Sequence, residues 1–247
     1  MATALAHDAH APGEHAGGHG EHTHYTSTGL EHRKIAVWAL IGSECMLFVS
    51  LISTYLVYKG RSKVGPWPHE WGCRISNVVG ESAAAVAAKG CAAGDVLKPI
   101  LDIPVTSQST FVLLMSSLAM VLALEGVEYA GQPSHAKWYK GSKFWLLVTA
   151  IMGATFLGYQ SYEFTSFVHE GLTIRTNLFG SSFFTLTGFH GTHVAVGVLW
   201  LMTMFFIDMK RGLKGQTDVL LVDICALYWH FVDVVWIAIF TLIYLIK

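Results

Sequence analysis

Five long apolar stretches constrain this chain more than any other feature of its sequence. Each holds about 20 mainly apolar residues, the length that a helix needs to cross a hydrocarbon core of roughly 30 Å. The chain is 53% hydrophobic and only 13% charged, with a mean hydropathy of +0.46, so the bilayer is its expected solvent. The sequence predicts an all-α fold, a polytopic membrane bundle of five transmembrane helices. The predicted spans are Ile35–Tyr58, Ser109–Val127, Phe144–Tyr162, Phe179–Ile207 and Val219–Ile246.

The first 33 residues differ in composition from the rest of the chain, being rich in His, Gly and Ala. They lack the apolar core of a cleavable signal, so we expect a disordered tail at 1–33, followed by a transmembrane domain at 34–247. Scattered histidines in a flexible tail have no fixed geometry, and no metal site is predicted there. A net charge of -1 gives no basic field for nucleic acid. The tail histidines are His7, His10, His15, His19, His22 and His24.

The distribution of basic residues predicts an orientation. With five spans, the amino terminus shares a side with the loops after the second and fourth spans, and the positive-inside rule places the more basic side in the cytoplasm. The carboxyl terminus and the long loop are then predicted to lie outside a bacterial inner membrane. Lys59, Arg61 and Lys63 lie on the opposite side and weaken the bias. The residues favouring a cytoplasmic amino terminus are Arg33, Lys34, Lys137, Lys140, Lys143, Lys210, Arg211 and Lys214.

The segment 59–107 is predicted to be a long extramembrane loop. It contains Cys73 and Cys91, which in an oxidising compartment are candidates for a disulfide. Cys45 and Cys225 fall inside predicted spans, where small apolar packing is the simpler interpretation. The Ala-rich run Glu81–Lys89 predicts a short helix within the loop. Turns are predicted at Pro66, Pro68, Pro99 and Pro104.

Five ionisable residues at bilayer depth are the candidate functional residues, because such groups are costly there and need a partner. His190 and His193 are three residues apart and share a helix face, as do His230 and Asp233. One interpretation is that they form interhelical hydrogen bonds that hold the bundle together. The other is that Glu44 shares a proton or a hydrogen bond with a histidine of the fourth span. Two histidines on one helix face suit neither haem nor copper ligation, so no metal is predicted.

Other residues in the spans are predicted to serve packing or to lie near the membrane surface. Small residues recur every four positions and predict close helix contacts. Glu125, Glu128 and Glu163 lie at predicted span ends, where partial solvation is expected. The two stripes of small residues are Ala150, Ala154 and Gly158 on the third span, and Thr187, Gly191 and Ala195 on the fourth.

The last two spans contain two motifs, Gly188–Val194 (GFHGTHV) and Tyr228–Trp236 (YWHFVDVVW). In this order, the two motifs resemble the signature of cytochrome c oxidase subunit III. Gly153–Phe164 (GATFLGYQSYEF) is similar to the family helix that ends in QxYEY, and Gly42–Phe48 (GSECMLF) to its SExxxF element. The resemblance covers nearly all of 31–247 outside the long loop. Two departures are the absence of the first two helices of longer members, as in five-span bacterial forms, and the inserted loop.

The resemblance implies a role as a non-redox membrane subunit of a proton-pumping oxidase in aerobic respiration. In that family the haems and copper lie in partner subunits, and this subunit stabilises the catalytic subunit, holds phospholipid and supports proton uptake. The expected partners are oxidase subunits I and II, membrane lipids and a cytochrome c or another respiratory complex. By the same resemblance, Glu44, His190, His193, His230 and Asp233 match the family's buried polar set and ligate no metal.

Two alternatives stay open from the sequence. The chain is similar enough to the equivalent subunit of a quinol oxidase, or of a nitric oxide reductase-associated homologue, that the motifs do not separate them. A stand-alone proton-coupled transporter is a third hypothesis, with Glu44 and the histidines lining a proton path. It predicts an internal repeat with broken helices, and the sequence has neither.

Overall fold

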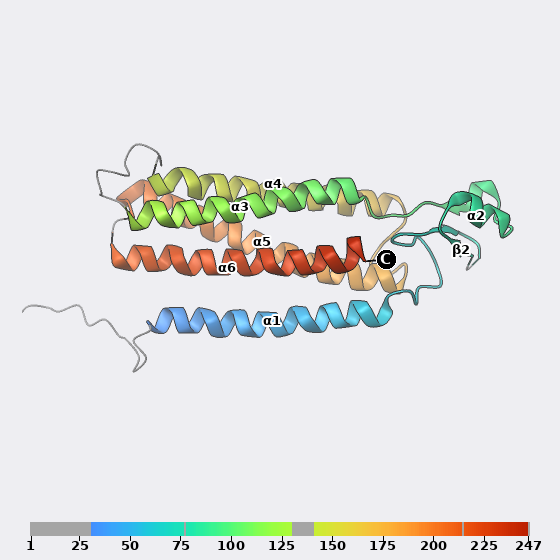
Figure 1. The fold of residues 1–247 in the computed structure, drawn as a ribbon, viewed down its shortest axis with the longest axis horizontal. Coiled ribbons are helices and arrows are strands. Elements are labelled where there is room, and N and C mark those ends of the chain that lie inside the picture. The colour runs from blue at the N-terminus through green and yellow to red at the C-terminus, as the bar shows by residue number, and fades with distance from the viewer. Residues whose placement is uncertain (1–30, 77, 130–140, 214, 247) are drawn as a thin grey trace, which may run out of the picture.

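Five long helices lie side by side along the length of the molecule (Figure 1). The structure is a computed structural model, and it describes residues 31–76, 78–129, 141–213 and 215–246. All five helices are long and apolar enough to span a membrane, which confirms the predicted all-α, five-span architecture. The helices are α1 (His32–Tyr58), α3 (Ile103–Glu128), α4 (Gly141–His169), α5 (Leu178–Arg211) and α6 (Gln216–Phe240), the last continued by a π-helical turn, η2 (Thr241–Leu245).

Part of the sequence prediction lies outside the described residues. This applies to the histidines of the tail, and to Lys137, Lys140 and Lys214, which were used to predict the orientation. Within the described ranges the chain runs alternately up and down the bundle (Figure 1). The start of α1 therefore lies at the same end of the bundle as the last residues of α3 and α5, as five consecutive spans require.

Two helices extend well beyond their predicted bounds. Helix α3 begins at Ile103, because Pro104 occupies its first turn, where its missing N–H costs no hydrogen bond. The predicted turn at Pro104 was therefore wrong. Helix α4 continues to His169, seven residues past Tyr162, and Glu163 in this added stretch accepts a hydrogen bond from Thr106 of α3. Helix α5 has 34 residues and is about 50 Å long, so it tilts or protrudes from a core of roughly 30 Å.

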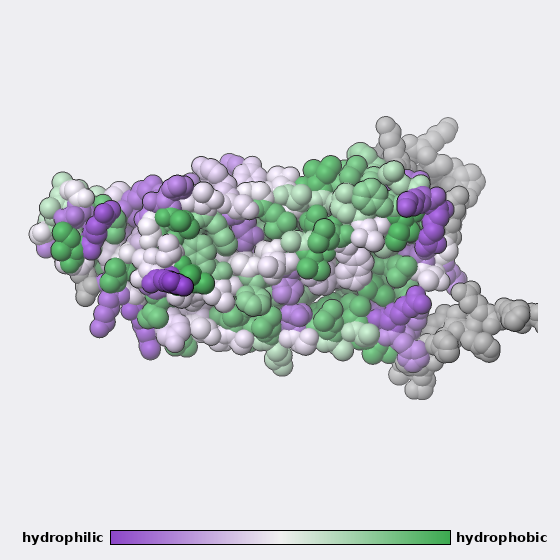
Figure 2. Space-filling model, turned by 180° about the vertical axis from the view of Figure 1, so that it is seen from behind, coloured by the Kyte–Doolittle hydropathy of each residue, from purple (hydrophilic) through white to green (hydrophobic). Residues whose placement is uncertain are grey.

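The helices differ in how deeply they are embedded in the bundle. Helices α3, α4, α5 and α6 pack closely on one another, and α1 lies along α5 and α6 at one edge (Figure 1). Phe48 and Tyr55 are the buried residues of α1. Ile41, Leu51 and Ile52 of α1 also pack partly against the core, and many of its other apolar side chains face outward. Hydrophobic residues dominate the middle of the molecule, and hydrophilic ones gather at both ends (Figure 2). We therefore expect lipid to contact the apolar outer surface at the middle of the bundle.

The segment between α1 and α3 folds into a small unit of its own. Three short strands, β1 (Trp71–Cys73), β2 (Val79–Gly80) and β3 (Val96–Leu97), form an antiparallel sheet in the order β2-β1-β3. Helix α2 (Ala83–Ala88) confirms the predicted short helix, and a 3-10 turn, η1, covers Ala93–Asp95. Such short strands carry no readable alternation, so the sequence did not predict them.

A disulfide and a small apolar core hold this unit together. Cys73 and Cys91 form a disulfide in the structure, and both pack on the fully buried Val86. The ring of Trp67 fills the space above Gly72, where any Cβ would overlap it. A larger residue at Gly72 would therefore displace the tryptophan.

Several polar contacts attach this unit to one end of the bundle. Asn177 caps α5 by accepting a hydrogen bond from the Gly180 N–H at 2.6 Å, while its amide donates to the Val64 carbonyl at 2.9 Å. Lys59 donates to the Ile246 carbonyl at 2.8 Å. Two further contacts join His69 Nε2 to the Ile243 carbonyl and Lys98 to Glu170, both at 2.8 Å.

Candidate functional site

A carboxyl and an imidazole from two helices meet near the middle of α1. His193 Nε2 lies 3.1 Å from Glu44 Oε2, and the side chains are 16% and 25% exposed, respectively. His193 Nδ1 lies 2.8 Å from the Phe189 carbonyl, which only accepts hydrogen bonds, so Nδ1 carries a proton. A proton must then also lie between Nε2 and Oε2 for that contact to be a hydrogen bond. The pair therefore holds one proton as a unit, either as a neutral pair or as an ion pair.

Neighbouring side chains fix the position of this pair. Phe48, one turn beyond Glu44, packs edge-on against His193 with ring centroids 5.1 Å apart. The Tyr228 hydroxyl of α6 donates to the His193 carbonyl at 3.1 Å. Three helices thus position the pair, and α1 contributes the carboxyl.

His190 has a different environment from His193, although both lie on α5. Its side chain is fully buried and stacks on Trp236, with ring centroids 4.8 Å apart and an interplanar angle of 25°. Phe156 meets it edge-on at 5.8 Å. Neither ring nitrogen has a hydrogen-bond partner in the described part of the chain. The imidazole is thus held by aromatic packing, and no three metal-binding side chains converge anywhere in the described ranges.

His230 and Asp233 meet at one hydroxyl of α3. Ser117 Oγ lies 3.0 Å from His230 Nδ1 and also donates to Asp233 Oδ2. The other carboxyl oxygen of Asp233 is buried and has no partner among the described residues. The structure therefore joins these two residues to α3, separately from the Glu44–His193 pair.

Hydroxyl groups along α3 form hydrogen bonds with buried polar groups of the neighbouring helices. The sequence did not lead us to predict these hydroxyl groups. Thr106, Thr110 and Ser117 are spaced at 4 and 7 positions, which puts them on one helix face. The Thr110 hydroxyl accepts a hydrogen bond from the Trp236 indole at 3.0 Å. The hydroxyl of Ser116, which directly precedes Ser117, accepts one from the Trp229 indole at 2.9 Å. That helical spacing of hydroxyls was the signal that could have found this face.

Glu163 corrects a prediction. It was expected to be partly solvated at a span end, but it is only 5% exposed and accepts a hydrogen bond from Thr106 of α3. The reason is that α4 continues past it, so Glu163 lies inside the bundle beside the start of α3. Tyr244 of the π-helical turn also hydrogen-bonds to Thr106. A third buried polar cluster therefore exists at the end of the bundle that carries the inserted unit.

Only one of the two predicted small-residue stripes packs as expected. Gly191 lies against the amide of Gln160, whose Nε2 donates to the Thr187 carbonyl at 2.7 Å. Gly158 of the other stripe faces open space. Gly153 of α4 and Gly197 of α5 both make room for the ring of Trp229 on α6.

Two further details differ from, or extend, the sequence analysis. Cys45 was expected to pack in the interior but is exposed, whereas Cys225 is buried as expected.

At the end opposite the inserted unit, Lys34 of α1 forms an ion pair of 2.6 Å with Asp223 of α6. Near the same end, Ser142 of α4 donates to Asp208 of α5.

Comparison with known proteins places this arrangement in a family. The model of the family described as cytochrome c oxidase subunit III matches residues 93–247, which include four of the candidate residues but not Glu44. Cytochrome c oxidase subunit 3 of Bacillus sp. (strain PS3) is 34% identical over 87% of this chain and 86% of the relative. Quinol oxidase subunit 3 of Bacillus subtilis (strain 168) is 33% identical over 85% of each chain.

A third relative extends across the inserted unit. Cytochrome bo(3) ubiquinol oxidase subunit 3 of Pseudomonas aeruginosa is 31% identical over 99% of this chain and 98% of its own length. The family motifs thus lie on helices that the structure brings together around the buried polar groups. The chain belongs to the cytochrome c oxidase subunit III family and is a membrane subunit of a haem-copper oxidase complex.

Proposed function

We propose that the chain is the non-redox subunit III of a proton-pumping cytochrome c oxidase. In this role it stabilises the catalytic subunit, contacts subunit II and supports proton uptake during turnover, while the haems and copper lie in those partner subunits. The observation that carries the proposal is the contact between Glu44 and His193, which pairs an acid with a base at bilayer depth between two helices. The proposed location is a bacterial inner membrane, with the amino terminus in the cytoplasm and the inserted unit outside.

The geometry of the pair supports a role that involves protons. A carboxyl at bilayer depth needs either a proton or a cation beside it, and the imidazole of His193 lies 3.1 Å away, where its protonated form would be that cation. Both side chains are also partly exposed, unlike the fully buried His190. The pair is therefore accessible to a neighbouring subunit or to lipid, which a purely structural hydrogen bond would not require.

The test is Glu44→Gln in the intact oxidase. Gln keeps the size of the side chain and can hydrogen-bond to His193, but its amide cannot ionise or release a proton. We expect unchanged haem content and faster loss of activity during sustained turnover. The matched control is Ser43→Ala, because the Ser43 hydroxyl donates only to the Leu40 carbonyl of its own helix. Equal inactivation kinetics for wild type and E44Q would contradict a role in proton or lipid support.

A quinol oxidase is the second candidate, because relatives of that type match at 33% and 31% identity. The two candidates differ in their partner subunits rather than in this chain. Purification of the complex separates them, since a subunit II with a copper-A centre indicates cytochrome c as donor. A complex that lacks copper-A and is reduced by quinol would replace the first proposal with the second.

A further inference from the structure

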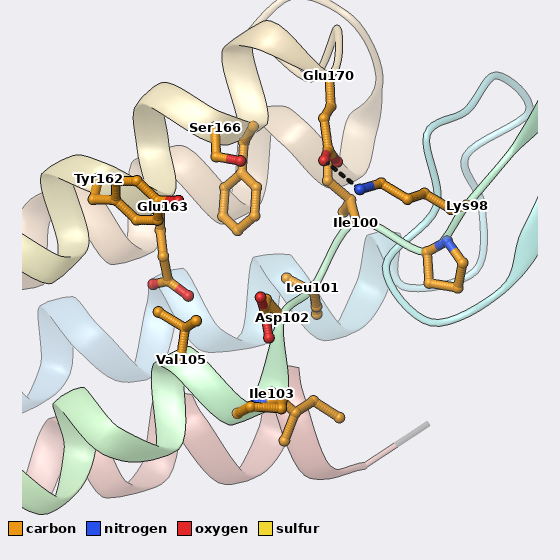
Figure 3. A pocket seen from close by; sticks show the side chains of 13 residues that line it. Lys98, Ile100, Leu101, Asp102, Ile103, Val105, Tyr162, Glu163, Ser166 and Glu170 are labelled. Atoms are coloured by element: carbon orange, nitrogen blue, oxygen red, sulfur yellow. Dashed lines mark ion pairs between the residues drawn. The ribbon is translucent and has the colours of Figure 1, made fainter.

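Two cavities of about 370 Å³ each lie where the inserted unit joins the bundle. Figure 3 shows the first, between the start of α3 and the last turns of α4, where Lys98 pairs with Glu170 at 2.8 Å. Its buried carboxyl, Glu163, already accepts a hydrogen bond from Thr106. The second cavity lies between the end of α1, the start of α5 and the inserted unit, and it contains a buried polar group without such a partner among the described residues.

Three buried aromatic residues form the apolar wall of this second cavity. Tyr55 of α1 and Phe179 of α5 meet edge-on, with ring centroids 6.3 Å apart, and Trp67 of the inserted unit completes the wall. Ser62 connects two of these residues, because its carbonyl accepts from the Trp67 indole at 3.3 Å and its hydroxyl accepts from the Phe179 N–H at 3.0 Å. The aromatic wall is therefore held together by the fold itself, as in most small-molecule sites.

Tyr55 carries the polar group of this wall that the fold leaves without a partner. The residue is 1% exposed, and its hydroxyl has no hydrogen-bond partner in the described part of the chain. Burying a hydroxyl without a hydrogen bond costs free energy, so buried hydroxyls in native proteins nearly always have a partner. An oxygen atom of a ligand bound in the cavity would provide that partner.

The rim of the cavity carries groups of both charge types. Lys59 and His69 provide nitrogen atoms, and Glu70 and Glu81 provide carboxylates. The side chains of Lys59 and His69 each contact a backbone carbonyl near the carboxyl terminus at 2.8 Å, and these contacts hold them at the rim. A charged ligand of either sign would meet at least one repulsive group here. A neutral ligand with hydrogen-bond donors and acceptors is compatible with both kinds of group.

The cavity lies at the level where the polar end of a membrane-embedded molecule is expected. Tyr55 is three residues before the end of α1, which corresponds to about 5 Å along the helix axis. Leu56 and Val57, the next two residues, are exposed on the apolar outer surface of α1. An apolar tail that leaves the cavity can therefore lie along α1 in the lipid, while a polar ring stays at the end of the span.

We propose that this cavity binds the ring of a membrane quinol or of its oxidised form, the quinone. Such a ring is planar and uncharged, and it carries oxygens at opposite edges, so it suits both the aromatic wall and the mixed rim. The Tyr55 hydroxyl donates to one ring oxygen. At the other edge, Lys59 donates to a quinone carbonyl or Glu70 accepts from a quinol hydroxyl. We assign binding alone to this cavity, without electron transfer, whichever electron donor the complex uses.

A photoreactive quinone locates the site in the intact oxidase. The probe is an azido-substituted decylubiquinone, which is activated by light in the complex and mapped by peptide mass spectrometry. We expect labelled peptides within residues 55–81 or around Phe179. Excess decylubiquinone should abolish this label, whereas decylbenzene, which has a ring and the same tail but no oxygen, should compete only weakly.

Two outcomes of the labelling experiment would overturn the proposal. Label confined to other subunits would show that no quinone enters this cavity. Equal competition by decylbenzene would show that the cavity is an apolar slot that does not recognise ring oxygens.

Tyr55→Phe tests the proposed hydrogen bond. It removes the hydroxyl and keeps the ring, so the probe concentration that gives half-maximal labelling should rise about fivefold. Tyr58→Phe is the matched control, because Tyr58 is exposed on the same helix and lies outside the cavity. The same half-maximal concentration for wild type, Y55F and Y58F would contradict the assigned role of Tyr55.

A second pair of variants tests the same site if Y55F does not assemble. Lys59→Met removes the donor at the other edge of the ring, and Lys63→Met, at an exposed position outside the cavity, is its control. The half-maximal concentration should rise for K59M alone, and equal values for both variants would sink the assignment. Haem content and subunit composition report on the proposed function separately. A normally assembled complex without label in this cavity would overturn this inference alone.

Discussion

At the scale of single residues, each intramembrane acid in the candidate site has a partner from another helix. Glu44 pairs with His193, Asp233 with Ser117, and Glu163 accepts from Thr106. Such pairing is expected because an unpaired polar group in an apolar interior costs more than the bond itself contributes. The net gain from each interhelical hydrogen bond is about 1 kcal/mol, but the cost of removing a partner is larger.

Ser117→Ala tests whether removing one hydrogen-bond partner costs more than the hydrogen bond contributes. The substitution leaves Asp233 and His230 without their shared hydroxyl, so the free energy of unfolding should fall by about 1–3 kcal/mol. Ser107→Ala is the control, since Ser107 is on the same helix but exposed. Unfolding in a detergent and denaturant series, followed by circular dichroism, measures both. Equal stabilities would mean that water or lipid replaces the hydroxyl at no cost.

Close packing around Trp229 gives a second residue-scale prediction. A Cβ at Gly153 would lie 2.5 Å from the Trp229 ring, whereas a Cβ at Gly158 of the same helix meets nothing within 4 Å. Gly153→Ala should therefore destabilise the chain by about 1–3 kcal/mol. Gly158→Ala should be neutral or stabilising by roughly 0.5–1 kcal/mol, because Ala favours the helix. Thermal unfolding of both variants measures these changes in stability. A G158A variant less stable than G153A would contradict the packing described around Trp229.

At the scale of elements, α1 is attached to the bundle mainly by contacts spread along its length. Lys34 pairs with Asp223 near its start, Glu44 with His193 near its middle, and Lys59 donates to the Ile246 carbonyl after its end. Phe48 and Tyr55 are the buried side chains between these contacts. Lipid packs equally well against either apolar face of a helix, so these polar contacts specify where α1 docks.

The inserted unit depends on its disulfide. Its strands have two or three residues each, too few to fold without a covalent tie. Cys73 and Cys91 are separated by 18 residues, and closing such a loop stabilises by about 3 kcal/mol in the chain-entropy description. Replacing both cysteines by Ser should leave the oxidase assembled but make 59–102 sensitive to protease.

Mass spectrometry without reductant checks the bond directly. A linked peptide containing Cys73 and Cys91 is expected from native membranes. Free thiols at both positions would remove the bond and the argument for an oxidising side. Cys225 is the internal reference, because it is buried and unpaired in the structure.

At the scale of the whole molecule, one end of the bundle carries the inserted unit and the carboxyl-terminal turn (Figure 1). The predicted orientation puts this end outside the cytoplasm. Alkaline phosphatase fused to the carboxyl terminus should therefore be active, and green fluorescent protein at the same position should be dark. Fusion after Arg211 should give the opposite pair of results. Fluorescence at the carboxyl terminus would invert the orientation.

The sequence by itself determined the five spans, their order and the depth of the candidate residues, because hydrophobic length and the cost of buried charge are local properties. It also identified the two cysteines of the inserted unit and the short helix between them. The structure changed the ends of α3 and α4. Pro104 fits the first turn of α3, where its missing N–H costs no hydrogen bond, and Glu163 lies inside the bundle because Thr106 of α3 donates to it.

The choice of partners was decided only by the tertiary structure. Both faces of each helix are apolar, so no periodicity distinguishes the lipid side from the core side. His190 and His193 were indistinguishable by spacing, yet one stacks on Trp236 and the other pairs with Glu44. The same holds for Gly153 and Gly158, of which one faces Trp229 and the other faces open space. Which side chain lies across from a given residue depends on helix rotation and crossing, and these are set by packing between distant segments.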